Sequence, residues 1–245
     1  MIEAVTFDLW NTLFTNRNYT EVRVNFLFGA LGENGISKSR DAIRKAYIYA
    51  SEQAQTVWKT ENYRHMTSAE KLETILEIID ARLPKETNDE VIKGFEEAIW
   101  SDPPSLKKGV KRTLETLAPS YRMGIISDAG ITPGRIARKA LRLRGILNYF
   151  ESTVFSDETG VCKPHRSMFD TILRQLESKP SNAIHVGDLL HTDVAGAKKA
   201  GFKSVWLRTN DAELSGVVRP DYIIEEIPQI IDILEELKQG KVNQY

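Results

Sequence analysis

The sequence predicts an α/β fold with a parallel sheet flanked by helices, together with a second domain built only of helices. Two observations predict the first part: short apolar runs recur along the chain, and helical patterns separate them. Strands that alternate with helices form parallel units with right-handed crossovers. A third observation predicts the second domain, because residues 16–101 contain several helical patterns and no convincing strand.

Six segments are predicted strands because each is a short β-branched or apolar run bounded by polar residues or glycine. They are residues 4–7, 123–126, 152–155, 183–186, 204–207 and 222–224. The helices expected between and after them are residues 107–117, 133–143, 165–176, 192–200 and 227–237. Pro133 suits a helix start, and Gly201 is typical of a helix end.

The helical insertion is predicted to contain helices at residues 20–31, 37–60, 67–81 and 88–100. Ser68 and Asn88 precede acidic first turns, which is a normal signal for a helix N-terminus. Asp102-Pro103-Pro104 ends the helical pattern. We therefore expect residues 1–15 and 102–245 to form the α/β domain and residues 16–101 to form the helical one.

Composition narrows the class of protein. A chain of 245 residues can hold one large core and a smaller satellite, and its net charge of -1 provides no overall attraction to nucleic acid or membrane. Its one cysteine, Cys162, rules out an internal disulfide, and no apolar run approaches the roughly 18 residues that span a bilayer. The N-terminus lacks the basic start of a signal peptide. We expect a cytoplasmic monomer or homodimer that acts on a small molecule, without nucleic-acid or membrane partners.

The ends of the first four predicted strands carry polar or charged groups, and ligands of parallel sheets bind beyond these ends. In chain order the candidates are Asp8, Trp10, Asn11, Thr12, Ser127, Asp128, Lys163, Asp188 and Asp193. Clustered carboxylates without histidine or cysteine suit a hard cation, of which Mg²⁺ is the expected one. A lysine and a hydroxyl beside that ion suit a substrate with anionic oxygens, and an aspartate can act as a covalent nucleophile.

This arrangement resembles the haloacid dehalogenase-like hydrolases, because four motifs occur in that family's order along nearly the whole chain. The resemblance implies a Rossmann-like core, with the helical insertion as a cap that closes over the site. Asp8 would be the nucleophile that forms an aspartyl-phosphate, while Ser127 and Lys163 would bind the phosphoryl oxygens. Asp188 would hold Mg²⁺ with support from Asp193.

The resemblance also implies which residues at the strand ends bind the metal and the substrate. The metal set would be Asp8, Asp188 and Asp193, completed by the backbone carbonyl of Trp10. Substrate-binding positions would be Trp10, Asn11, Thr12, Ser127, Asp128 and Lys163.

One departure concerns proton transfer. The commonest family pattern is Asp-x-Asp-Gly-Thr, and Trp10 stands at the second aspartate, which protonates the leaving group and then activates water. An indole N–H donates a hydrogen bond but cannot cycle a proton near neutral pH, and losing a general acid typically costs about 10²–10⁴ in rate. Asn11 replaces the usual glycine, and asparagine tolerates unusual backbone angles. The Trp10 side chain either packs or shapes the pocket.

Three functions follow as alternatives. The first is a Mg²⁺-dependent phosphatase acting on a small phosphorylated metabolite. The second is a metal-independent 2-haloacid dehalogenase, since such enzymes of the family also lack the second aspartate; the retained Asp188 and Asp193, and Asp128 in place of asparagine, count against it. The third is a non-catalytic protein that binds Mg²⁺ and a phosphorylated ligand.

Simpler roles exist for several of these residues. Ser127 could cap a turn and Lys163 could lie on the surface. His185 is expected to pack in the core, and the spacing of the other histidines indicates no metal site.

Overall fold

The computed structural model describes residues 1–208 and 218–240, and its centre is a six-stranded parallel sheet. The strands follow the order β3-β2-β1-β4-β5-β6 across the sheet. Their bounds are β1 (Ala4–Phe7), β2 (Arg122–Ser127), β3 (Ser152–Phe155), β4 (Ala183–Gly187), β5 (Lys203–Leu207) and β6 (Tyr222–Ile224). The predicted α/β fold is confirmed, and each predicted strand agrees with the structure to within one residue at either end.

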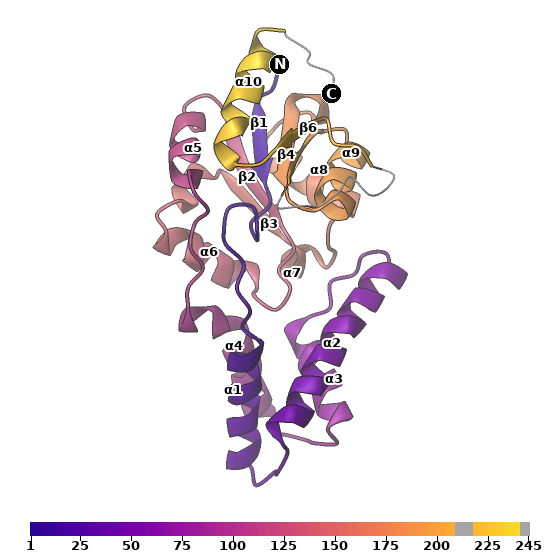
Figure 1. Cartoon of the computed structure of the whole chain (residues 1–245). Helices are drawn as coiled ribbons and strands as arrows, with labels where there is room; N and C mark the ends of the chain where they lie inside the picture. The colour runs from indigo at the N-terminus through magenta and orange to yellow at the C-terminus, as the bar shows by residue number, and fades with distance from the viewer. Residues whose placement is uncertain (209–217, 241–245) are drawn as a thin grey trace.

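Helices cover both faces of the sheet because successive strand residues point to opposite sides. Val5 and Phe7 belong to a core cluster with α5 (Val110–Leu117), α6 (Gly134–Leu143) and α10 (Ile230–Lys238). Ala4 belongs to a second cluster with α8 (Arg166–Gln175) and α9 (Ala195–Ala200). Figure 1 shows α5 and α6 on one side of the sheet and α8 and α9 on the other.

Short helical segments complete this part of the molecule. They are α7 (Ser156–Thr159), the 3₁₀ turns η1 (Ala98–Ser101), η2 (Leu147–Tyr149), η3 (Pro180–Asn182) and η5 (Ile227–Gln229), and the π-helical turn η4 (Leu190–Val194). The turn η4 follows β4 directly and leads into α9, so it lies at the carboxyl edge of the sheet.

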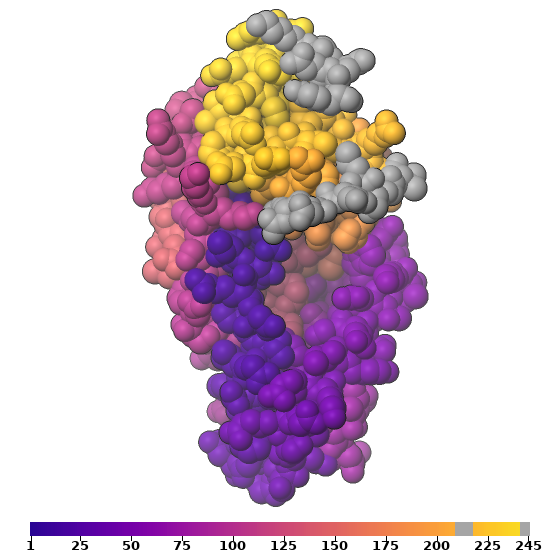
Figure 2. All heavy atoms as spheres, viewed as in Figure 1, coloured from indigo at the N-terminus to yellow at the C-terminus, as the bar shows by residue number. Residues whose placement is uncertain are grey.

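Four helices between β1 and β2 form what we call the helical lobe. They are α1 (Thr20–Glu33), α2 (Arg40–Thr60), α3 (Ser68–Ile78) and α4 (Lys85–Glu97). The lobe has a core of its own, in which Leu27, Ile43, Leu72 and Phe95 are buried. It extends away from the sheet (Figure 1), and the space-filling view shows an elongated molecule with the lobe at one end (Figure 2).

Two predicted N-terminal helix signals differ from the structure, although α3 itself begins at Ser68, within one residue of its predicted start. Thr67, not Ser68, caps α3: its hydroxyl accepts the backbone N–H of Glu70, whose carboxylate in turn accepts the N–H of Thr67. The helix α4 begins at Lys85 after Pro84, so Asn88 lies inside it and donates its amide to the carbonyl of Leu83. Proline at the N-cap starts this helix one turn earlier than the acidic run suggested.

Several further helices differ from their predicted bounds: α2 begins at Arg40 instead of residue 37, and α10 begins at Ile230, after the turn η5, instead of residue 227. The helix predicted at residues 107–117 begins at Val110, because Gly109 adopts a left-handed conformation with φ 79°. The segment predicted as a helix over residues 192–200 divides into η4 and α9, and ends at Gly201 as expected. Within the described residues no helix combines the length and apolarity needed to cross a membrane.

Candidate active site

A buried lysine joins three of the predicted site segments. Lys163 lies in the loop between α7 and α8, here called the lysine loop. Its Nζ donates to Asp8 Oδ1 at 2.5 Å and to Asp193 Oδ1 at 2.6 Å. Asp8 directly follows β1, and Asp193 lies in η4 after β4. All three side chains are buried. The order of strands in the sheet, with β1 between β2 and β4, brings these distant segments together.

Burial and mutual charge set the protonation of this group. Burial raises the pKa of Asp8 to about 7; Lys163 opposes the rise, and Asp193 and Asp188 add to it. The pKa of Lys163 lies above its usual range, because the carboxylates around it outweigh the effect of burial. The pKa of Asp193 lies below its usual range, because Lys163 and His185 outweigh burial in the same way. Asp8 is therefore the carboxyl group of this pair that takes up a proton first.

Both carboxylate oxygens of Asp193 have polar partners. Its Oδ1 also lies 3.3 Å from His185 Nε2, and its Oδ2 accepts the backbone N–H of Leu189 at 3.0 Å. Gly187 makes room for it, since a Cβ there would lie 2.2 Å from Asp193 Cγ. Both oxygens of Asp193 are therefore engaged, and its contacts hold Lys163 in place. Its place in the predicted metal set, in support of Asp188, stays a prediction.

His185 is buried in β4, as expected of a packing histidine, but it also has polar partners. Its Nδ1 lies 2.9 Å from the hydroxyl of Thr6, and its ring packs edge-on against Phe169. Burial lowers the pKa of His185, which favours the neutral ring. A chain of contacts therefore runs from Thr6 in the sheet through His185 to Asp193.

Four buried oxygens around this edge of the sheet have no hydrogen-bond partner among the described residues. They are Asp8 Oδ2, Thr12 Oγ1, Ser127 Oγ and Thr192 Oγ1. Buried polar atoms in folded proteins are nearly always hydrogen-bonded, so a group of unpartnered ones at strand ends suits a ligand rich in oxygen atoms or a cation. Thr192 was not predicted from the sequence, and its place beside Asp193 was the signal available.

The donor set for a cation is small. No group of three or more His, Cys, Asp or Glu side chains in the described part of the chain is arranged to hold a metal ion. Asp8 keeps one unpartnered oxygen, and Asp188 is half-buried, with its pKa raised to about 6 by burial and by Asp193. Two carboxylates with water and a backbone carbonyl fit Mg²⁺, which usually keeps several waters.

Asp128 supports the lysine loop from the end of β2. Its Oδ1 accepts the backbone N–H of Lys163 at 2.9 Å. Burial raises the pKa of Asp128 to about 7, and Lys163 opposes this rise. The side chain also lines the pocket described below, so it touches both the lysine loop and the space open to a ligand.

The loop after β1 shows how the chain departs from the family pattern. Asn11 has φ 61°, the left-handed conformation that asparagine tolerates. The half-buried Trp10 ring packs against Phe14, with ring centroids 5.9 Å apart. Lys107, which the sequence predicted only as the first residue of a helix, donates from Nζ to the carbonyl of Asn11 at 2.6 Å. Lys107 therefore holds the loop after β1 in place through this hydrogen bond.

A pocket of about 510 Å³, here called the junction pocket, lies between the helical lobe and the strand ends. The lobe side is formed mainly by the end of α2, the loop after it and Lys71 of α3; the other side includes Asp128, Cys162 and Thr192. Trp58 Nε1 donates to the carbonyl of Lys163 at 2.8 Å, and the N–H of Cys162 donates to the carbonyl of Tyr63 at 2.7 Å. The lobe therefore rests directly on the lysine loop.

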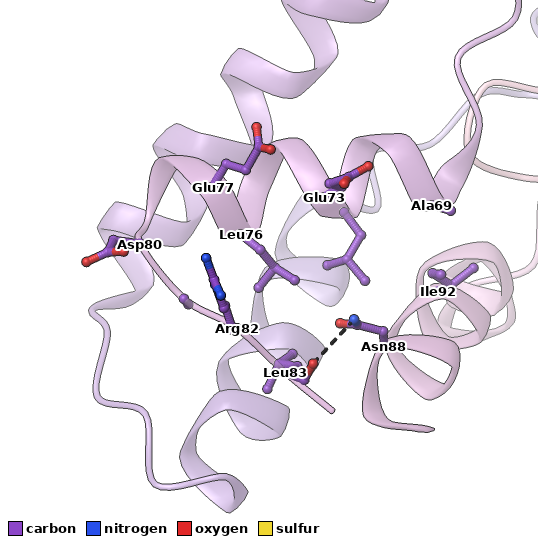
Figure 3. A pocket seen from close by; sticks show the side chains of 11 residues that line it. Ala69, Glu73, Leu76, Glu77, Asp80, Arg82, Leu83, Asn88 and Ile92 are labelled. Atoms are coloured by element: carbon purple, nitrogen blue, oxygen red, sulfur yellow. Dashed lines mark hydrogen bonds between the residues drawn. The ribbon is translucent and has the colours of Figure 1, made fainter. Parts of the chain in front are cut away.

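A larger cavity, of about 690 Å³, lies within the helical lobe between α3, α4 and the loop that joins them (Figure 3). Leu76, Arg82 and Ile92 line it, and none of the predicted site residues does. Its size therefore does not mark it as the active site, because the clustered carboxylates and lysine lie elsewhere.

Comparisons with known sequences point to one family. A family model described as a haloacid dehalogenase-like hydrolase matches residues 2–201. Glyceraldehyde 3-phosphate phosphatase of Pyrococcus furiosus is 38% identical over 131 residues, which is 52% of this chain and 53% of that protein. The chain thus aligns with about half the length of this relative. The protein of the same name from Methanopyrus kandleri is 25% identical over 97% of this chain and 99% of its own length.

Solved structures give the same picture at the level of the fold. A HAD phosphatase from Thermococcus onnurineus is 25% identical, with a TM-score of 0.65, and the match covers 95% of this chain and 98% of that one. A 2-haloacid dehalogenase from Pseudomonas syringae pv. Tomato is 21% identical, with a TM-score of 0.72, over 97% of this chain and 100% of that one. The second likeness shows a shared fold alone.

Proposed function

This chain belongs to the haloacid dehalogenase-like hydrolases, and on that basis we propose that it is a magnesium-dependent phosphatase acting on a small phosphorylated metabolite. One observation carries the proposal: Lys163 holds Asp8 by one carboxylate oxygen, while the other oxygen of Asp8 is buried without a partner. A phosphoryl group beside Asp8 would meet a fixed cation and a nucleophile. The relatives named as phosphatases support this choice.

We place the reaction in two steps at Asp8. Its carboxylate attacks phosphorus, an oxygen–phosphorus bond forms, and the ester bond to the leaving group breaks. Water then hydrolyses the aspartyl-phosphate, which releases phosphate and restores the carboxylate. Lys163 and the unpartnered hydroxyls of Ser127 and Thr12 would bind the phosphoryl oxygens.

Mg²⁺ would be held by Asp8, Asp188 and the Trp10 carbonyl, and when bound it neutralises negative charge on the phosphoryl oxygens. Asp193 acts as a positioning residue, because its oxygens are committed to Lys163, His185 and Leu189 N–H. We also propose that residues 16–101 act as the cap, since the lobe contacts the lysine loop through Trp58.

Trp10 sets the preference for leaving groups. It cannot donate a proton to the departing oxygen, so esters whose leaving groups depart as stable anions should react best. Acyl and aryl phosphates have this property. Slow turnover of alkyl phosphates is expected from the native chain.

The dehalogenase alternative has less support. Its structural relatives share the fold at low sequence identity, whereas relatives with higher identity are named phosphatases. Halide release from 2-chloropropionate without metal would favour the dehalogenase and contradict the proposal.

The test is p-nitrophenyl phosphate turnover with Mg²⁺ and with EDTA. We expect turnover with Mg²⁺, its loss in EDTA and its recovery when Mg²⁺ is restored. Asp8→Asn should lower turnover by at least about 10³-fold, as expected for loss of a covalent nucleophile. Asp170→Asn, an exposed substitution on α8, is the matched control and should change nothing.

Two results would contradict the proposal. Turnover that EDTA does not change would exclude a requirement for Mg²⁺. Turnover that survives in a folded Asp8→Asn variant would exclude Asp8 as the nucleophile. A protein that only binds Mg²⁺ and a phosphorylated ligand would show no turnover to lose.

A further inference from the structure

Lys71 is a buried cation that has no anionic partner in the part of the chain that the structure describes. It lies in α3, its side chain is 7% exposed, and it lines the junction pocket. Its Nζ donates to the carbonyl of Gly130 at 3.0 Å, and within residues 1–208 and 218–240 it forms no ion pair. A buried charge that lacks a counter-ion is costly, so natural proteins rarely keep one without a function.

The neighbours of Lys71 do not neutralise it. Glu70, next in sequence, is bound to Arg64, which also pairs with Glu61. Burial raises the pKa of Cys162 to about 12, so that thiol is neutral near pH 7. Burial lowers the pKa of Lys71 to about 8, which leaves it mostly charged at neutral pH.

A second buried cation adds to the positive charge. Arg23 of α1 is buried, and its guanidinium donates to the carbonyl of Phe95, the hydroxyl of Tyr47 and the hydroxyl of Thr132. All three acceptors are neutral, and the charge of Arg23 disfavours the charged form of Lys71. The two cations repel each other across the loop after β2, and an anion in the pocket would relieve this repulsion.

The junction pocket also adjoins the reaction site. Asp128 lines the pocket and binds the backbone of Lys163. Thr192 lines it too, with a buried hydroxyl that has no partner, and is followed directly by Asp193. A substrate whose phosphate is held by Lys163 would therefore place its leaving group in the junction pocket, which Lys71 lines from the helical lobe.

We propose that Lys71 binds a second anionic group, a carboxylate or a second phosphate, on the leaving-group side of the substrate. This inference rests on the proposed phosphatase function and narrows it to a substrate class. It separates this chain from relatives named for glyceraldehyde 3-phosphate, whose leaving group is uncharged.

The test compares esters that share a three-carbon skeleton. 3-Phosphoglycerate carries a carboxylate where glyceraldehyde 3-phosphate carries an aldehyde and glycerol 3-phosphate carries a hydroxymethyl group; propane-1,3-diyl bisphosphate carries a second phosphate. We expect kcat/KM to be higher for one of the two esters with a charged leaving group than for the two esters with an uncharged one. The expected difference is about tenfold to a hundredfold, the usual range for a hydrogen bond to a charged group. The ester favoured identifies the group.

Lys71→Met should reduce that preference to near unity, mainly through KM. Lys93→Met, an exposed lysine of α4, is the matched control and should keep the preference of the native chain. Met fills a similar volume without charge, so Lys71→Met should unfold at the same temperature as the native chain or a higher one.

The outcomes separate the two proposals. The inference is overturned if an active enzyme shows equal kcat/KM for esters with charged and with uncharged leaving groups, or if the preference survives Lys71→Met. Either result leaves the proposed phosphatase function intact. Absence of phosphate release from p-nitrophenyl phosphate as well as from every one of these alkyl esters overturns the phosphatase. Calorimetric binding of 3-phosphoglycerate and the bisphosphate to Asp8→Asn, with and without Lys71→Met, then decides the role of Lys71 independently of turnover.

Discussion

At the scale of single residues, Trp10 is the position where the sequence predicts the loss of the family's usual general acid. Its ring packs against Phe14 within the same loop, and the left-handed Asn11 turns the chain away directly after it. The ring therefore stabilises the loop that carries Asp8, while the indole contributes no exchangeable proton for catalysis near neutral pH. Packing and proton transfer make opposite demands on this position.

Trp10→Asp should raise turnover of alkyl phosphates. A carboxyl group two residues after Asp8 restores a general acid, and such groups contribute about 10²–10⁴ in rate. The gain should be small for p-nitrophenyl phosphate, whose leaving group needs no proton. The measurement is kcat for both substrates, with Trp10→Phe as the control that keeps the ring packing. A folded variant without any gain on alkyl phosphates would mean that another residue transfers the proton.

At the scale of secondary structure, the decisive element is the end of β4 and the turn η4 that follows it. Gly187 ends the strand, and the absence of its Cβ lets Asp193 fold back against the strand end. From there Asp193 reaches both Lys163 and His185. The position of the lysine therefore depends on a glycine that never touches it.

Gly187→Ala should lower turnover per folded molecule in addition to lowering the free energy of unfolding. The new Cβ would overlap Asp193, and overpacking of this kind costs about 1–3 kcal/mol of unfolding free energy. Displacing Asp193 also shifts Lys163, and small misplacements in an active site cost up to about 10² in rate. Gly124→Ala in β2, whose Cβ would crowd Ile172 of α8, is the matched control: it should destabilise similarly and keep its turnover per folded molecule. Equal turnover in the two variants would disprove the coupling.

At the scale of the whole molecule, the helical lobe and the sheet meet at His65. Ser156 accepts the N–H of Ala129 with its hydroxyl oxygen, and this hydroxyl lies 3.0 Å from His65 Nδ1, so that it can donate to a neutral ring. Burial lowers the pKa of His65 to about 4, and the charge of Lys71 acts in the same direction. The burial of His65 at the contact between the helical lobe and the sheet therefore favours an uncharged ring.

This preference predicts how stability varies with pH. A histidine in the unfolded chain has a pKa near 6.5, so between pH 6.5 and 4 the unfolded state binds a proton that the folded state excludes. The free energy of unfolding should fall as the pH falls through this range, by up to about 1.4 kcal/mol per pH unit. His65→Gln should weaken this dependence, whereas the exposed His191→Gln should retain it. Urea unfolding at several pH values measures both, and identical profiles for the two variants would refute the role of His65.

Local patterns in the sequence were enough to predict the α/β class, the six strands and the order of the four motifs. Each depends on neighbouring residues, because apolar runs and helix signals act over a few positions. The same patterns misplaced the capping residue of α3 and the start of α4, since competing N-terminal signals lie within one turn of each other.

Only the tertiary structure decided which groups meet. Sequence order could not show that Asp193 engages Lys163 and His185 with both oxygens, that Lys107 binds the loop after β1, or that Lys71 enters the junction pocket without a counter-ion. These contacts join residues up to 96 positions apart. They depend on strand order and on how the lobes pack, which arise from the burial of whole faces rather than from any local run of residues.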